Sequence, residues 1–197
     1  MSRNDAPLEL PELPAGARYH FVGRRRHVVF ATRADKIKYM HEAAIRDAED
    51  PIVLSWAGQF SPLPRPACER AILQFAQLAI RYERDPSWYD AQGKRHGVEV
   101  LDSPGVVVHR GFGDCDAKER FFRALCLACD VPAEIDPVLI GEYGFPHVRS
   151  KVWYTAAELR DWYEIDTDAP RWLVADPTIV NSTIGRLPRH ALTSLPL

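Results

Sequence analysis

Hydrophobic and polar positions in the first half of the chain change from a strand-like to a helical period. Runs of aromatic and branched residues at 18–22 and 27–31 flank a Gly-Arg-Arg-Arg turn and predict two strands. From Thr32 the apolar positions recur with a helical period, and this helix is expected to end at the Ala-Glu-Asp-Pro run. A second and more apolar helix is predicted over 66–82, with Pro66 in its first turn.

The middle of the chain predicts short elements that lead into one strongly apolar helix. Residues 85–97 are rich in turn-forming residues, and 98–101 has the composition of a short strand. Ser103-Pro104 is expected to open a short helix that stops at Gly111. After this glycine, apolar residues within 117–130 recur with the spacing of a helix that is buried on one side.

The last third of the chain has the composition of a sheet. Three short segments rich in branched and aromatic residues, 134–140, 147–154 and 172–175, predict antiparallel strands. A Thr-x-x-Glu capping box opens a short helix between the second and third of them, so we interpret 155–169 as an insertion. The tail from 181 onward has the composition of a loop. Helices packed on an antiparallel sheet define an α+β fold.

Length and composition fit one ordinary globular unit. The chain has 197 residues, 26% of them charged and 46% hydrophobic, which predicts a single domain over 1–197 with a loose, proline-rich arm at 1–15. The formal net charge of −2 gives no general attraction to nucleic acid or to anionic membranes. Neither a long apolar run nor a signal-peptide pattern is present, so we expect a cytoplasmic protein with no membrane partner.

The segment Gly113-Asp-Cys-Asp carries the most informative chemistry. It places Cys115 in the first turn of the apolar helix, where unpaired N–H groups and the helix dipole stabilise a thiolate, and the Cys115 N–H itself is a candidate oxyanion donor. Asp114 is well suited as the N-cap, but both it and Asp116 would raise the thiol pKa if they faced the sulfur. His147, at the start of a strand, is the candidate base. Asp176, at the end of the next strand, is the candidate carboxylate that orients it.

These motifs, in this order, resemble the transglutaminase-like superfamily, which shares its Cys, His and Asp with papain-like folds. The resemblance rests on Gly113-Asp-Cys-Asp, on His147-Val before a strand, and on the run from Trp172 to Thr178, and it covers roughly 66–180. A subset encoded by phages and prophages typically has Gly-Asp-Cys-Asp-Asp, whereas this chain has Ala117 at the last position. The interval from the histidine to the aspartate is also longer than usual, which we attribute to the insertion.

The resemblance implies a cysteine acyl-transfer enzyme. Its nucleophile would be Cys115, its base His147 and its orienting acid Asp176, on a nucleophile helix packed against an antiparallel sheet. We expect a peptidase or amidase that acts on peptide or side-chain amides through a thioester, without a cofactor or a metal. The alternative is a non-enzymatic phage or prophage structural or assembly protein that retains the fold, with assembly partners and a place in the virion.

Two further assignments stay open at this stage. Cys126-x-x-Cys129 invites a redox or zinc interpretation, but it lies within the apolar face of a helix, and core packing is favoured. A second oxyanion donor, which members of the family take from a glutamine or tryptophan, has three candidates in Gln59, Trp88 and Gln92, and no motif selects among them.

Overall fold

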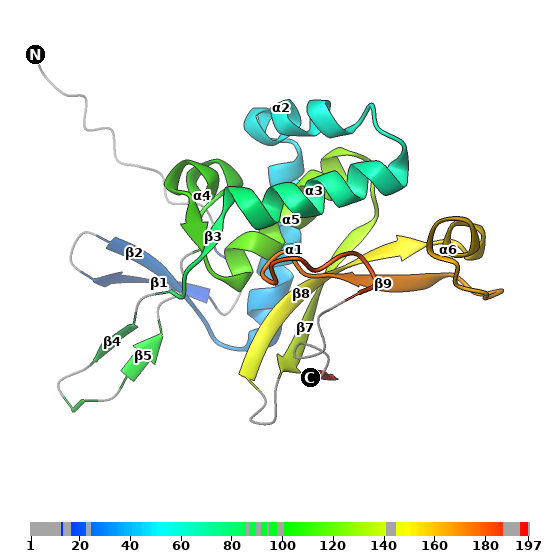
Figure 1. The fold of residues 1–197 in the computed structure, drawn as a ribbon. Coiled ribbons are helices and arrows are strands. Elements are labelled where there is room, and N and C mark those ends of the chain that lie inside the picture. Colours follow the sequence, from blue (N-terminus) through cyan, green and yellow to red (C-terminus); the bar gives the residue numbers. More distant parts are fainter. Residues whose placement is uncertain are drawn as a thin grey trace, which may run out of the picture.

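The computed structural model describes residues 13, 17–22, 25–85, 87–89, 92–93, 95–97, 101–140, 145–186 and 194–196. Helices and small sheets alternate in these residues, in agreement with the predicted α+β class (Figure 1).

Six helices lie within the described residues. They are α1 Arg33–Ala48, α2 Pro51–Phe60, α3 Arg65–Ala79, α4 Pro104–Arg110, α5 Cys115–Ala128 and α6 Ala156–Tyr163. The described strands are β1 Ala17–Val22, β2 Arg25–Phe30, β3 Arg81–Tyr82, β4 Ser87–Tyr89, β5 Arg95–Gly97, β6 Phe112–Gly113, β7 Ala133–Ile140, β8 Phe145–Tyr154, β9 Arg171–Ala175 and β10 Ser194–Pro196.

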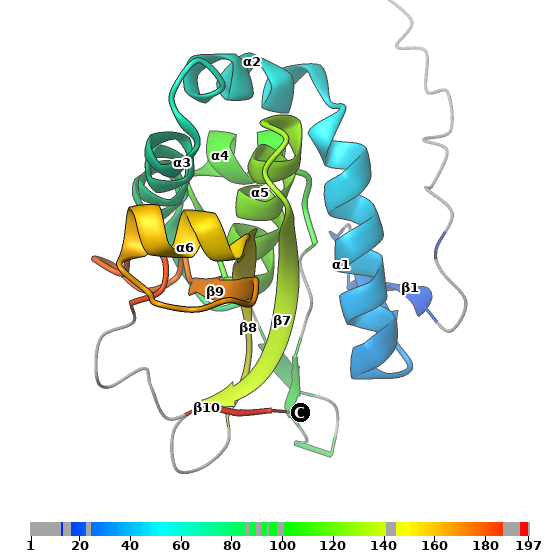
Figure 2. The same cartoon turned by 90° about the vertical axis from the view of Figure 1, so that its right-hand side faces the viewer.

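The largest sheet has the order β10-β7-β8-β9, and every neighbouring pair in it is antiparallel. Its three longer strands confirm the predicted strands of the C-terminal third. The capping box at Thr155 is also confirmed, and it opens α6 between β8 and β9 (Figure 2). The remaining sheets are the hairpins β1-β2 and β4-β5 and the parallel pair β3-β6.

Two predictions from the sequence are wrong, and one helix was not predicted. Helix α2 was missed, 85–97 contains the hairpin β4-β5 instead of only turns, and the tail supplies the edge strand β10. The predicted strand at 98–101 falls mostly on residues outside the described ranges, and Leu101 lies outside any strand. Most of the predicted arm at 1–15 also lies outside the described residues.

The missed helix has a clear local cause. The Asp50 side chain accepts a hydrogen bond from the Ile52 N–H at 2.7 Å, and Pro51 occupies the first turn, where its missing N–H costs nothing. An Asp-Pro pair that ends α1 therefore also begins α2.

Helix α5 is the centre of the molecule. It packs against α1, α2, α3 and α4 on one side and against β7 and β8 on the other, as Figures 1 and 2 show. All of its residues from Asp116 to Cys126 are buried, charged ones included. The sequence pattern predicted burial on one side only, so this expectation is corrected: the helix is enclosed on all sides.

Two charged residues of α5, Lys118 and Glu119, form hydrogen bonds inside the fold. Lys118 donates from Nζ to the carbonyl oxygen of Ile80, and its burial lowers its pKa to about 8. Glu119 is 0% exposed and accepts a hydrogen bond at 2.6 Å from the hydroxyl of Ser150, which lies on β8. These contacts explain how a charged stretch of sequence is tolerated in the interior.

Two arginines of α5 connect it to neighbouring elements. Arg120 makes a two-pronged contact with the Asp47 carboxylate on α1, at 2.5 and 2.9 Å. Arg123 donates to the Ala133 carbonyl of β7 at 2.9 Å and to the His41 carbonyl of α1 at 2.6 Å. The guanidinium groups thus fix α5 against both α1 and the sheet. Within the described residues, no helix is long and apolar enough to cross a membrane.

Candidate active site

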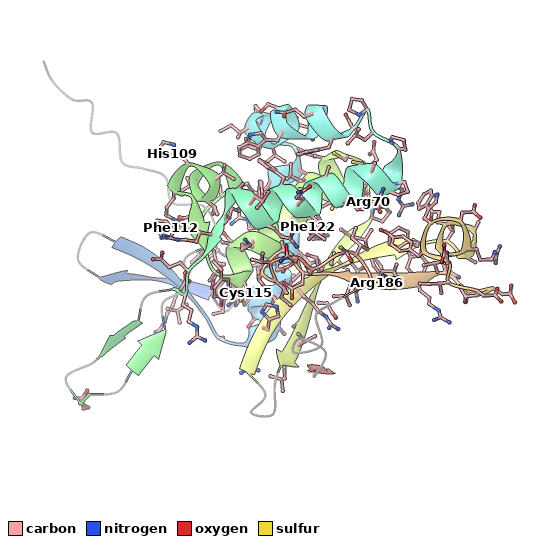
Figure 3. The ribbon with its side chains drawn as sticks, in the orientation of Figure 1. Arg70, His109, Phe112, Cys115, Phe122 and Arg186 are labelled. Carbon is pink, nitrogen blue, oxygen red and sulfur yellow. The ribbon has the colours of Figure 1, made fainter. Side chains whose placement is uncertain are left out.

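The local sequence places Cys115 at the first residue of α5. The Asp114 side chain accepts from the Ala117 N–H at 3.2 Å, which confirms the predicted N-cap. Just before it, Gly113 has no room for a side chain, because a Cβ there would lie 2.8 Å from the Ala117 Cβ. Gly111 ends α4 with a φ of 77°, a conformation that glycine adopts without strain. Figure 3 shows Cys115 at the end of α5 that meets the sheet.

The strand register brings His147 and Asp176 together. Asp176 directly follows β9, whose last residue, Ala175, pairs with Ser150 of β8. The Nε2 atom of His147 lies 2.8 Å from Oδ2 of Asp176, and both side chains are largely buried, at 8% and 1% exposure. Since a carboxylate can only accept, Nε2 carries the proton of this hydrogen bond.

Asp176 is held in a fixed orientation by the turn that follows it. Its Oδ1 atom accepts from the backbone N–H of Thr178 at 2.9 Å and from the Thr178 hydroxyl. The Ser182 hydroxyl donates to the Asp176 carbonyl at 2.6 Å. Burial by itself would raise the pKa of Asp176, but His147 and Thr178 outweigh it and hold the pKa below its usual value. The group is therefore an ionised carboxylate at neutral pH.

Cys115 lies where α5 meets β8. It packs against the small core cluster that contains Val148, the residue after His147, and the Val148 N–H forms a hydrogen bond with the Cys115 sulfur. The three residues that the sequence selected, one from a helix and two from neighbouring strands, thus lie in one buried region.

Burial and two neighbouring carboxylates decide the protonation state of Cys115. Burial raises the pKa of the thiol above its ordinary value, and the charges of Asp116 and Asp114 raise it further. The Val148 N–H and Lys36 lower it by less. The Cys115 Sγ atom lies 3.8 Å from Oδ1 of Asp116. The sequence predicted that Asp114 and Asp116 would raise the thiol pKa if they faced the sulfur, and this prediction is confirmed. The resting sulfur is therefore a neutral thiol.

Replacing Asp116 with asparagine should accelerate alkylation of Cys115. Loss of the carboxylate removes a charge that raises the thiol pKa and leaves the ammonium of its ion-pair partner Lys36 to act on the sulfur. Below the pKa, each unit by which it falls gives about tenfold more thiolate. The measurement is the iodoacetamide rate constant at Cys115 by mass spectrometry over neutral to mildly alkaline pH.

Asp130→Asn is the matched control, because Asp130 influences Cys129 and not Cys115. The electrostatic account would be refuted if Cys115 reacted with iodoacetamide at the same rate in Asp116→Asn and in Asp130→Asn.

The structure supports none of the three residues that the sequence offered as a second oxyanion donor. Gln59 is exposed on α2, Gln92 is exposed, and the Trp88 side chain lies outside the described residues. Sequence reasoning missed Tyr82 of β3, a half-exposed residue whose pKa is raised by partial desolvation and then by the charges of Cys115 and Asp114, which places its hydroxyl within electrostatic reach of this site. His109 is exposed on α4, apart from Cys115 (Figure 3).

Cys126 belongs to the main hydrophobic core, as the packing interpretation predicted. Sequence reasoning also missed Glu119, although its position four residues after Cys115 places both on one helix face.

Among the described residues, two clusters bring three donor atoms suited to a metal within 4.8 Å of one another. One is Asp114 with Cys115 and Asp116, and the other is Glu119 with His147 and Asp176. In the first, Asp116 forms an ion pair with Lys36, and in the second the histidine and aspartate bind each other. We therefore assign a metal to neither cluster.

A thiol, an imidazole and an ionised carboxylate are the three kinds of group that cysteine acyl transfer uses. No protein-family model matches the chain, and no curated protein matches it. Among solved structures, the chain is similar to a crystal structure of a TGase, with 14% identity and a TM-score of 0.39. The match covers 89% of this chain and 47% of that one, so the chain spans about half the length of that protein. The likeness is weak, and the side-chain geometry above does not depend on it.

Proposed function

We propose that this protein is a transglutaminase-like cysteine acyl-transfer enzyme that acts as a peptidase or amidase on peptide or side-chain amides. The observation that carries the proposal is the His147–Asp176 hydrogen bond, together with a thiol at the N-terminus of a buried helix that accepts a hydrogen bond from the N–H of Val148, the residue after His147. Each of these features alone is common in structural roles. Together they supply a nucleophile, a base and a group that orients the base.

The first half-reaction follows from the hydrogen bonds. Asp176 engages Nε2 of His147, which leaves Nδ1 as the ring nitrogen that can accept the proton of the thiol. The sulfur of Cys115 attacks the amide carbon as this proton leaves, and a tetrahedral oxyanion forms. The Cys115 N–H lies in the first helical turn, where the helix offers no acceptor, and can donate to this oxyanion. The protonated imidazole next gives its proton to the departing amine, and a thioester remains on Cys115.

The second half-reaction regenerates the thiol. His147 takes a proton from a water molecule, the hydroxide adds to the thioester carbon, and the acid leaves as the sulfur regains a proton. An amine in place of water would give a new amide instead. The raised thiol pKa supports a mechanism in which proton removal accompanies attack, since little thiolate exists beforehand.

Incubation with a mixture of casein-derived peptides in water enriched in heavy oxygen tests the proposal. Hydrolysis of a backbone or side-chain amide should place heavy oxygen in the new carboxyl group, and acid-quenched protein should carry a thioester at Cys115. Cys115→Ala should lose both signals. Cys129→Ala should keep both, because Cys129 lies outside the site at the end of α5.

The outcomes separate the two functional hypotheses. Product formation that survives Cys115→Ala would refute the proposed nucleophile. The absence of any thioester or heavy-oxygen product, with these peptides and with small activated esters, would favour the non-enzymatic phage or prophage alternative.

A further inference from the structure

Glu119 stands against the candidate triad and has no role in the mechanism above. One of its carboxyl oxygens, a ring nitrogen of His147 and a carboxyl oxygen of Asp176 all lie within 4.8 Å of one another. The Glu119 side chain is 0% exposed, so water does not solvate it. Two carboxyl groups therefore meet in a dry part of the molecule.

The hydrogen bonds of Glu119 are asymmetric. Its Oε2 atom accepts from the Ser150 hydroxyl at 2.6 Å. Its Oε1 atom is buried and receives no hydrogen bond from any donor in the described part of the chain. A buried carboxylate oxygen without a donor is costly, and a second ionised carboxylate nearby increases that cost. The conflict disappears if the carboxyl group carries a proton and donates it.

We propose that Glu119 is a neutral carboxylic acid that donates a hydrogen bond to Asp176 and so positions Asp176, and through it His147. Asp176 is the acceptor because its own hydrogen bonds, from His147 and Thr178, all favour its ionised form. The assignment deepens the proposed function and rests on it for its role in catalysis. Glu119 touches no reacting atom and is a positioning residue.

The charges that face Glu119 agree with a neutral form. Burial raises the pKa of Glu119 well above its usual value, and the adjacent Asp176 carboxylate raises it further. The Ser150 hydroxyl and the Lys118 ammonium act in the opposite direction. Of these causes, Lys118 has the smallest effect on the pKa of Glu119. Its Nζ atom donates to the backbone carbonyls of Ile80 and Gln77.

The protonation state can be measured without any substrate. Carbon NMR of selectively labelled glutamate should show a carboxyl signal that stays neutral when the exposed glutamates ionise, and this signal should vanish in Glu119→Gln. The buried Glu69, whose pKa is also raised, is told apart because its signal remains in that variant. A wild-type titration in which the signal that Glu119→Gln removes ionises together with the exposed glutamates would overturn the inference.

Stability against pH gives a second readout. A carboxyl whose pKa is raised in the folded state contributes its stability below its unfolded pKa, and this contribution is lost as pH rises toward the folded pKa. Above the ordinary glutamate value of 4.5, wild type should thus lose stability relative to Glu119→Gln, by up to about tenfold in the unfolding constant per pH unit. Glu49→Gln, at an exposed position, should instead track wild type. If the free energy of unfolding changed with pH in the same way for wild type and Glu119→Gln, the proposal would be contradicted.

The positioning role is tested by acylation of Cys115 with 4-nitrophenyl acetate. Glutamine preserves both a donor for Asp176 and an acceptor for Ser150, so Glu119→Gln should stay within about threefold of wild type at low pH. As the pH rises and wild-type Glu119 loses its proton, the acylation rate of wild type should fall relative to that of Glu119→Gln. Glu119→Leu keeps the size but not the donor and should lose about tenfold or more in rate.

Failure of this inference is distinguishable from failure of the proposed function. A protein that shows no acylation in any variant would refute the enzymatic proposal, while NMR and the stability curves would still decide the state of Glu119. An active enzyme in which Glu119→Leu matches Glu119→Gln at every pH would refute the positioning role alone.

Discussion

Replacing His147 with glutamine is expected to slow acylation of Cys115 by roughly 10²- to 10⁴-fold, the usual contribution of a general base. The effect should be large here because burial and two aspartates raise the pKa of the thiol, so almost none of it is ionised without help. Glutamine keeps a donor near Asp176 but cannot accept the proton of the thiol. The measurement is the burst of nitrophenolate released when the protein is mixed with 4-nitrophenyl acetate.

His109→Gln is the matched control, because this histidine is exposed on α4 outside the candidate site. It should react as wild type does. If His147→Gln and His109→Gln gave the same rate, the thiol would react without a base, and the proposed role of His147 would be wrong.

Replacing Asp47 with asparagine is expected to destabilise the fold by about 3 to 5 kcal/mol, the usual cost of removing one member of a buried ion pair. Arg120 holds both oxygens of this carboxylate, and the two side chains are only 7% and 11% exposed. Without the carboxylate, a guanidinium stays in the interior without its counter-charge. Urea unfolding followed by circular dichroism gives the free energy of unfolding.

The control is Asp136→Asn, which removes a more exposed pair with Arg149 at 3.0 Å and should cost about 0 to 1 kcal/mol. The double variant Asp47→Leu with Arg120→Met should recover most of the loss, because it removes both charges and keeps the volume. A single Asp47→Asn variant as stable as Asp136→Asn would show that the buried pair contributes little.

The sheet was predictable because its strands are short runs of branched and aromatic residues with clear turns between them. Helix α2 was not, because Asp50-Pro51 fits both the end of one helix and the start of the next, and local pattern does not choose between them. Strand β10 was missed for a different reason. Its three residues become a strand only by pairing with β7, a partner more than fifty residues earlier in the chain.

The parts of the candidate site that depend on local sequence signals could be predicted. A cysteine after a helix cap and two polar residues at strand ends are local signals, and the register of β8 and β9 then brings the latter two together. The burial of Glu119 and the ion pair of Lys36 with Asp116 depend on how α1 and the sheet enclose α5. A Lys-Glu-Arg stretch has the sequence of a solvated helix face, so periodicity could not reveal that all three residues are interior.

The complete enclosure of α5 makes the candidate site depend on cooperative folding of the elements around it. A helix whose lysine, glutamate and arginines find their partners on α1, at the end of α3, at Leu101 and on the sheet gains little from forming before those neighbours dock. Its amide protons should thus exchange with solvent only when the whole domain opens. A partly folded chain would lack the strand register that brings His147 to Asp176, so the arrangement confines any acyl chemistry at this site to the native state.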